Sequence, residues 1–211
     1  MLALTIATVH AEDGSRVGCG LLQEVAEENF MIGDLDPLGE ATATGSVTAI
    51  QVDETDMICY MGYAVNLEPD LLSVHSGANG TDCSETNGCG THIHAGKSCA
   101  DKDSQMGHFY NEEALGGDSA VALGVDPWAI LGYDYTSSDG EADYMNCVRT
   151  GETDYMNRAF IVHANDGSRV ACGLLEEASE DSDDGDSSES AATGKALAAI
   201  FAAFAAIYNL A

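Results

Sequence analysis

Residues 43–52 (ATGSVTAIQV) and 57–65 (MICYMGYAV) are two apolar runs of strand length, rich in β-branched and aromatic side chains. Turn-forming and charged residues bound both runs, which is the pattern of consecutive β-strands. Similar runs follow at residues 119–125 (SAVALGV), 141–148 (EADYMNCV) and 158–164 (RAFIVHA), and no long stretch of helical periodicity interrupts them. Together they predict an all-β fold, a sandwich or barrel of antiparallel strands.

A repeated segment indicates where this domain ends. Residues 9–22 read VHAEDGSRVGCGLL and residues 162–175 read VHANDGSRVACGLL, so 12 of 14 positions are identical at an offset of 153 residues. A period of this length is that of a domain rather than of a solenoid unit. We therefore expect residues 1–22 to be the C-terminal remnant of a preceding repeat, 23–42 to be a linker and 43–176 to be one complete domain.

The composition excludes some classes of partner. Asp and Glu number 36 against 7 Lys and Arg, a formal net charge of −29. Sequence-independent binding of nucleic acid depends on cationic side chains, so no nucleic-acid partner is expected. Docking on anionic lipid is disfavoured for the same reason. Hydrophobic residues make up 45% of the chain, which is enough to build a core.

The C-terminal segments have the order of a GPI-attachment signal. Residues 177–195 form an acidic linker rich in small residues, and residues 196–211 (ALAAIFAAFAAIYNLA) are a hydrophobic tail without charge. A small residue, a polar spacer and a short apolar tail are the parts of such a signal, and Ser187, Ser188 or Ser190 could be the attachment site. The alternatives are an Ala-rich helix packed on the domain and a short membrane helix. Residues 1–14 make a poor signal peptide, so we expect the chain to be a fragment of a longer one.

The chain has seven cysteines and no Cys-x-x-Cys pair, which favours disulfides over a zinc ribbon and implies an oxidising compartment. Cys19 lies in the remnant, so its partner would lie outside it and six cysteines remain in the full domain. Six cysteines allow 15 connectivities. Cys83 and Cys89 could close one loop, and Cys59 and Cys147 could pair across the sandwich.

Four of the histidines have the spacing of a metal site. His92 and His94 stand two residues apart in THIHAG, and such residues on a strand point to the same face, so both rings can reach one ion. His108 follows in GHFYN, and His163 ends an apolar strand-like run. Four imidazoles favour copper or zinc over calcium or magnesium. His75 has no such context, and we expect it to be an ordinary surface or core histidine.

These motifs together resemble the Cu/Zn superoxide dismutase superfamily. Its members carry a His-x-His strand, a cysteine and a Gly-x-His-Phe-like turn, and then a Val-His strand and a Ser-Arg-x-Ala-Cys-Gly segment. The counterparts here, in the same order, are HIH at 92–94, Cys99, GHFYN at 107–111, FIVH at 160–163 and SRVACG at 168–173. The resemblance covers most of residues 43–176 and implies the Greek-key β-barrel of that family.

The resemblance also implies roles for individual residues. The copper ligands would be His92, His94, His108 and His163. Arg169 would stand beside the copper and help to hold superoxide, and His108 would also carry a proton during catalysis. Cys99 and Cys172 would form the intrasubunit disulfide.

Two features of the zinc-containing family are missing. Its members hold zinc with two further histidines and an aspartate, whereas residues 109–162 contain no histidine. We therefore expect one copper per complete domain and no zinc. Only residues 164–167 separate His163 from Ser168, so the long loop that steers superoxide is absent. Both departures resemble the copper-only branch, and the tandem repeat resembles its multi-domain, surface-anchored members.

The expected function is copper-dependent disproportionation of superoxide to O₂ and hydrogen peroxide at the cell surface. Membrane attachment would be through the C-terminal anchor only, and preceding repeat domains would be further partners in the intact protein. The negative charge repels superoxide, so a slower enzyme than a steered one is expected. One alternative is a non-catalytic copper-binding, buffering or one-way redox protein. Another is a structural surface module, which would let its ligands decay, whereas His10 and Arg16 persist even in the remnant.

Overall fold

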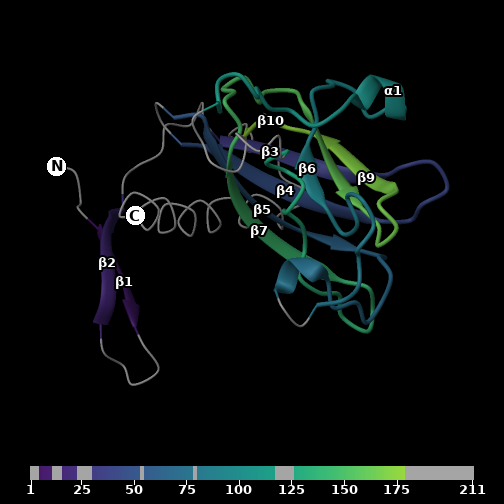
Figure 1. Ribbon diagram of the computed structural model, residues 1–211, viewed down its shortest axis with the longest axis horizontal. Helices are drawn as coiled ribbons and strands as arrows, with labels where there is room; N and C mark the ends of the chain where they lie inside the picture. Colours follow the sequence, from purple (N-terminus) through teal and green to yellow (C-terminus); the bar gives the residue numbers. More distant parts are fainter. Residues whose placement is uncertain are drawn as a thin grey trace, which may run out of the picture. The chain divides into compact units, whose positions relative to one another are not determined.

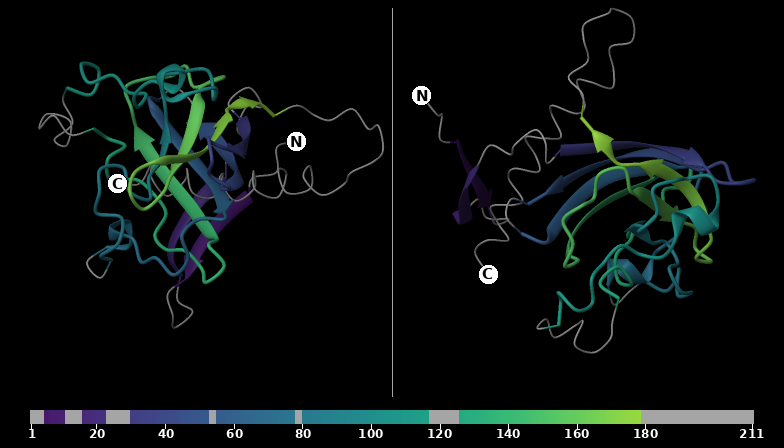
Figure 2. Two further views of the ribbon diagram at one scale, coloured as in Figure 1. Left: turned by 90° about the vertical axis from the view of Figure 1, so that its right-hand side faces the viewer. Right: turned by 90° about the horizontal axis from the view of Figure 1, so that it is seen from above.

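The computed structural model describes residues 5–10, 16–22, 30–52, 55–77, 80–116 and 126–178. The unit Phe30–Ala178 is nearly all β, with eight antiparallel strands in one curved, nearly closed sheet (Figures 1 and 2). Its strands are β3 (Phe30–Pro37), β4 (Thr44–Gln51), β5 (Met57–Val65), β6 (Thr91–Ile93), β7 (Ala142–Arg149), β8 (Ala159–His163), β9 (Arg169–Leu174) and β10 (Glu176–Glu177). Two short helices lie in its described loops, η2 (Val74–Ser76) and α1 (Lys102–Gln105). The predicted all-β barrel or sandwich is confirmed.

The strands are ordered β6-β8-β9-β3-β4-β5-β7, with β10 paired to β3. The chain forms β3, β4 and β5 as neighbouring antiparallel strands and then crosses to the far edge for β6. It returns to pair β7 with β5 and crosses again to β8. These crossings separate the fold from a simple meander and fit the predicted Greek-key type of connection.

Alternation along the strands defines the core. In β7 the buried Ala142, Tyr144 and Val148 alternate with exposed neighbours. Strand β8 is buried on both faces, with Phe160 and Val162 in the barrel core and Ile161 in a small outer cluster with Cys172. Apolar side chains therefore pack against both faces of this strand.

One predicted boundary is wrong. Residues 30–37 were expected to belong to a linker, but they form β3, which lies in the middle of the sheet. Met31 and Leu35 are buried, whereas Asp34 and Asp36 face solvent. The acidic residues and the glycine give this strand the composition of a linker, although its alternation is that of a half-buried strand. Glu177 was expected to begin the acidic linker. It lies in β10 instead, where it pairs with Met31 of β3.

The repeat is visible in the backbone. In the other unit, β1 (Thr5–His10) and β2 (Arg16–Leu22) form a separate two-stranded antiparallel sheet. The pairing is interrupted between Val9 and His10, and the β8–β9 pairing is interrupted between Val162 and His163. These positions correspond in the repeat, so the two segments share their hairpin register as well as their sequence.

Three disulfides lie in the barrel unit: Cys59–Cys147, Cys83–Cys89 and Cys99–Cys172. Cys59 and Cys147 face each other on adjacent strands, β5 and β7, rather than across a sandwich. Three disulfides in a unit of this size are typical of an oxidising, extracellular or secreted environment.

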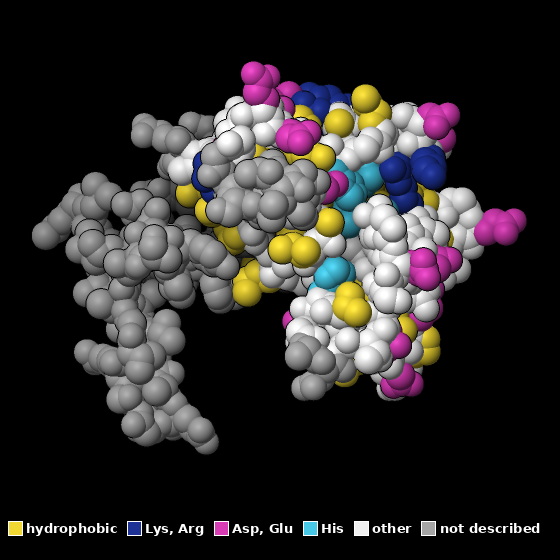
Figure 3. Space-filling model, viewed as in Figure 1, with side chains coloured by type: hydrophobic (Ala, Val, Ile, Leu, Met, Phe, Trp, Pro, Cys, Tyr) yellow, Lys and Arg dark blue, Asp and Glu magenta, His cyan; other side chains and the backbone are white. Residues whose placement is uncertain are grey.

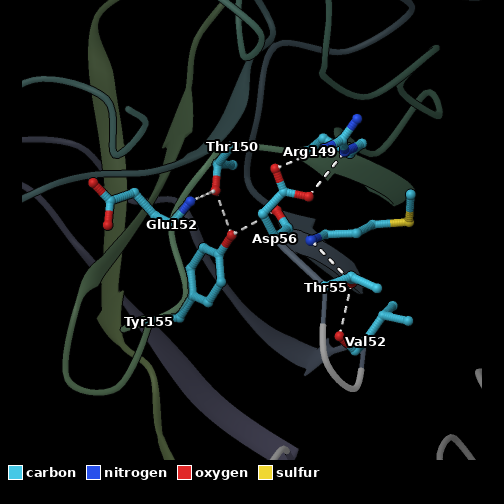
Figure 4. Close-up of polar contacts among 8 residues, drawn as sticks. Val52, Thr55, Asp56, Arg149, Thr150, Glu152 and Tyr155 are labelled. Atoms are coloured by element: carbon cyan, nitrogen blue, oxygen red, sulfur yellow. Dashed lines mark hydrogen bonds and ion pairs between the residues drawn. The ribbon is translucent and has the colours of Figure 1, made fainter. Parts of the chain in front are cut away.

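An ion pair ties the end of β7 to the residue before β5 (Figure 4). The guanidinium of Arg149 donates to both carboxylate oxygens of Asp56, at 2.8 and 3.1 Å. Next to it, the hydroxyls of Thr150 and Tyr155 are hydrogen-bonded, and the Thr150 N–H donates to the Asp56 carbonyl at 3.0 Å. The network closes this end of the β5–β7 pair.

Several expectations lie outside the described residues. They are the strand predicted at 119–125, the remaining acidic linker, the tail at 196–211 and the serines proposed for lipid attachment. Among the described residues, no helix has the length and apolar character that crossing a membrane requires.

Candidate metal centre

Strand β6 turns its histidines away from the barrel core. Ile93 is fully buried in the core, and the Thr91 hydroxyl lies 3.1 Å from that of the core residue Tyr60. Since successive side chains on a strand point to opposite faces, His92 and His94 lie on the outer face of the wall. Both residues are almost completely buried, so other segments of the chain cover them on that face.

The four predicted ligands come together. His94 and His108 form an isolated antiparallel bridge, and His163 ends β8, the neighbour of β6. One possible ligand atom from each of the four histidines lies within 4.8 Å of all the others. Their ring centroids are between 4.4 and 6.5 Å apart for the pairs in contact.

Every one of these rings has one nitrogen held by a protein oxygen. Nε2 of His92 lies 3.0 Å from the Leu131 carbonyl, and Nδ1 of His94 lies 3.0 Å from the Met106 carbonyl. Nδ1 of His163 lies 2.8 Å from the carbonyl of residue 167. A carbonyl oxygen only accepts, so each of these nitrogens carries the hydrogen and the other nitrogen presents a lone pair.

The remaining nitrogens have no partner in the protein. Nδ1 of His92, Nε2 of His94 and Nε2 of His163 are buried without a hydrogen bond. A buried polar atom without a partner costs free energy, and a bound cation would satisfy all three at once. The residues present therefore fit a metal ion, and an all-imidazole donor set suits copper or zinc.

Burial also keeps these rings neutral. Desolvation lowers the pKa of His94 to about 3 and that of His163 to about 4, although each bonded carbonyl opposes the shift. Desolvation, with the neighbouring histidines, lowers the pKa of His92 well below its ordinary value. At neutral pH the rings can accept a metal without first releasing a proton.

Asp126 is a site residue that the sequence did not reveal. Its Oδ2 lies 2.5 Å from Nδ1 of His108, and its Oδ1 accepts from the Trp128 N–H at 2.9 Å. The carboxylate is thus fixed by the turn that it begins, and it leaves Nε2 of His108 for the metal. Asp126 is 18 residues from His108 in a different loop, so no spacing rule marks it.

Arg169 stands beside the ligands. Its guanidinium donates to the side chain of Gln105 at 2.7 Å and to the Met106 carbonyl at 2.8 Å, the same carbonyl that holds His94. Its charge contributes to the lowered pKa of His94 and of His163, behind the larger effect of burial. The Cys99–Cys172 disulfide joins the loop after β6 to β9 close to this arginine in the chain.

The face of the molecule in Figure 3 is mixed in charge. Histidine side chains reach the surface at two places on the face in Figure 3, one of them beside a group of Lys and Arg side chains. His108 is the least buried of the four ligands, with 9% of its side chain exposed. The site is thus covered but not sealed.

No protein-family model and no curated protein matches the chain. The geometry of the four histidines therefore carries the functional argument.

Proposed function

We propose that the domain is a copper-dependent superoxide dismutase of the copper-only type. One observation carries the proposal: four histidines bring one possible ligand atom each within 4.8 Å of one another, and three of their rings have a buried nitrogen without a partner. A guanidinium stands beside them. When bound, copper would supply one-electron chemistry, by which one superoxide is oxidised to O₂ and a second is reduced and protonated to hydrogen peroxide. Zinc has no such redox chemistry, so the proposed activity requires copper.

The protein groups around the site have distinct tasks. His92, His94 and His163 would hold the metal through the nitrogens that lack partners, and their bonded carbonyls fix the rings. Arg169, anchored by Gln105 and a carbonyl, presents a fixed positive charge that attracts an anion of the size of superoxide.

The pair of His108 and Asp126 suits proton transfer. Asp126 holds the hydrogen on Nδ1 of His108 and stabilises the ring when Nε2 also carries a proton. His108 lies at the exposed side of the cluster, so a proton can reach it from solvent. His108 would have to release the metal before Nε2 could carry a proton, and in that state we assign to Nε2 the delivery of the proton to peroxide.

A second candidate function is copper binding without turnover, as a buffer or one-way redox protein. The net charge of −29 favours it, because it attracts cations and repels superoxide. The same ligands would serve both functions.

The two candidates are separated by superoxide decay after a radiolysis pulse, with superoxide in large excess over the copper-loaded chain. A dismutase continues first-order removal over many equivalents, and His163→Ala abolishes it. Loss of about one equivalent followed by no further reaction would favour the one-way protein. The zinc-loaded chain is the control and should show no reaction above background.

We also propose that the protein acts at the cell surface through a GPI anchor attached near residues 187–190. The disulfides support an oxidising environment, and the order of residues 177–211 supports the anchor. A phospholipase that cleaves phosphatidylinositol should release the protein from cells. Retention on the cells after complete cleavage of a known anchored protein would contradict the anchor.

A further inference from the structure

His75 has an unusual pair of hydrogen-bond partners. Its ring extends from η2, with Nδ1 3.2 Å from the Ile130 carbonyl and Nε2 3.0 Å from the carbonyl of Gly88. The ring packs over Gly132, where a Cβ would lie 2.6 Å from the imidazole Cδ2. The glycine therefore leaves the space that the ring occupies.

Both partners of His75 are acceptors. A neutral imidazole has one N–H and one lone pair, so it can satisfy only one of two carbonyl oxygens and repels the other. Only the ring with both nitrogens protonated donates two hydrogen bonds. The ring thus lies between two backbone carbonyls that belong to different segments of the chain.

The two segments that His75 joins both belong to the surroundings of the metal centre. Residue 130 lies between Asp126, which holds His108, and Leu131, whose carbonyl holds His92. Gly88 precedes β6, which carries His92. Two backbone bonds also join the segments, from the Thr91 N–H to Leu131 and from the Tyr133 N–H to Cys89.

Few charged groups face this bridge. The packed segments carry Asp82 and Glu85 on one side and Asp126 on the other. Asp82 accepts from the Leu72 N–H, and Asp126 accepts from His108 and Trp128. Among the ion pairs of the described residues, none includes His75. The bridge therefore depends on the two carbonyls.

We propose that His75 is a positioning residue of the metal centre. Through its contacts with the Ile130 and Gly88 carbonyls it holds residues 126–132 against residues 83–90 and so keeps the acceptors of His92 and His108 in place. Its effect on metal binding rests on the proposed copper site, whereas the bridge itself exists without metal.

The bridge is tested first in the metal-free full chain by ¹⁵N NMR of the histidine rings at about pH 6. The expected spectrum shows Nε2–H for His92. In His75→Gln the side-chain amide cannot reach both the Ile130 and the Gly88 carbonyl. The neighbouring Leu131 carbonyl should then no longer hold His92 in a single tautomer. His163, which is held by residue 167 outside the bridged segments, should keep its tautomer and is the internal control.

Hydrogen exchange and copper affinity complete the test, with Val74→Ala as the matched control from the same helical turn. In His75→Gln, the Thr91 and Tyr133 amides should exchange about tenfold faster. The dissociation constant for Cu(II) should rise about tenfold, at the low end for residues that support metal ligands. Val74→Ala should change neither.

Two results would overturn the inference. One is a hydrogen on Nδ1 rather than on Nε2 of His92 in the wild-type spectrum. The other is a His92 tautomer and exchange rates in His75→Gln equal to those of Val74→Ala. If the wild-type chain binds no copper, the proposed function fails, yet the ring spectra and exchange rates still decide whether His75 forms the bridge.

Discussion

At the residue scale, each ligand of the metal centre depends on the oxygen that holds its other ring nitrogen. Three of these oxygens are backbone carbonyls, and the fourth belongs to Asp126. A carbonyl is fixed by the fold, but the carboxylate of Asp126 can be removed by substitution without altering a ligand. Asp126 is therefore the residue at which support of the metal can be tested separately from ligation.

We expect Asp126→Ala to raise the dissociation constant for Cu(II) by about 10–100-fold, because His108 then loses the partner that fixes its tautomer. Asp126→Asn should lose less, since the amide oxygen still accepts from Nδ1. Competition titration with a copper chelator measures both values. Asp139→Ala, the same change at an exposed carboxylate, is the control, and equal affinities for Asp126→Ala and Asp139→Ala would contradict the role of Asp126.

Two glycines next to the ligands should respond differently to alanine. At Gly90 a Cβ would collide with Cε1 of the His92 ring, whereas at Gly107, beside His108, a Cβ meets nothing within 4 Å. Gly90→Ala should therefore displace His92 from Leu131 and weaken Cu(II) binding about tenfold or more. Gly107→Ala should bind as the wild type does. The same titration measures both variants, and equal binding would show that His92 can move without cost.

The four histidines could be expected to share a site because His-x-His on a strand has a fixed geometry. Asp126 and Leu131 could not be found in this way, since their positions depend on how loops distant in sequence pack together. His75 was interpreted as an ordinary surface or core histidine, and no motif around it points to its two carbonyl partners.

At the scale of elements, the disulfides close loops of very different length. Cys99–Cys172 joins residues separated by 73 positions, and Cys83–Cys89 joins residues separated by 6. In the chain-entropy account, a link that closes a longer loop restricts the unfolded chain more strongly. The first link should therefore contribute more to the stability of the domain.

Replacing both Cys99 and Cys172 by alanine should lower the free energy of unfolding by about 4 kcal/mol, and replacing both Cys83 and Cys89 by about 2 kcal/mol. Urea unfolding of the metal-free chain measures both values. Each double variant removes two sulfur atoms, and all four cysteines are at least partly buried. The two variants are therefore matched in the atoms that they lose. A larger loss from the short loop would contradict the entropic account.

The ion pair between Asp56 and Arg149 should make stability depend on pH. The hydrogen bond from Arg149 lowers the pKa of Asp56, so the pair stabilises the fold above the pKa of an unfolded aspartate, about 4. This contribution is lost as the pH falls through the lowered folded pKa. The stability difference between wild type and Asp56→Asn, from urea unfolding, should be constant near neutral pH and shrink in acid. A difference that grows in acid would contradict the assignment.

The edges of the elements were the least predictable. The runs at 43–52, 57–65 and 141–148 became β4, β5 and β7, because they are rich in apolar, β-branched and aromatic residues and end at turn-forming residues. Strand β3 was missed because two of its outward positions are aspartates and one inward position is glycine. Its burial comes from pairing with β4 and β9, which the local composition does not show.

At the scale of the whole molecule, charge opposes the proposed substrate. The chain has a formal net charge of −29, and superoxide is an anion. The field of the molecule should therefore lower the encounter rate, whereas Arg169 acts only close to the site. Salt screens charges beyond about 8–10 Å and should weaken the repulsion more than the local attraction.

The rate constant for superoxide removal should therefore rise with ionic strength up to physiological salt. Pulse radiolysis at a series of salt concentrations measures it. A rate that falls with salt would show that local positive charge dominates, and a flat dependence would contradict repulsion by the net charge. Arg169→Gln is the control, and its rate should be lower at every salt concentration.

The most direct test of the account is the electron paramagnetic resonance spectrum of the full chain with one equivalent of Cu(II). The account predicts one tightly bound ion whose hyperfine structure shows histidine nitrogens, and His94→Gln should remove one of them. The acidic residues of the chain offer a competing, oxygen-rich environment for a cation. A spectrum of oxygen ligands that His94→Gln leaves unchanged would place copper outside the four histidines and contradict the central claim.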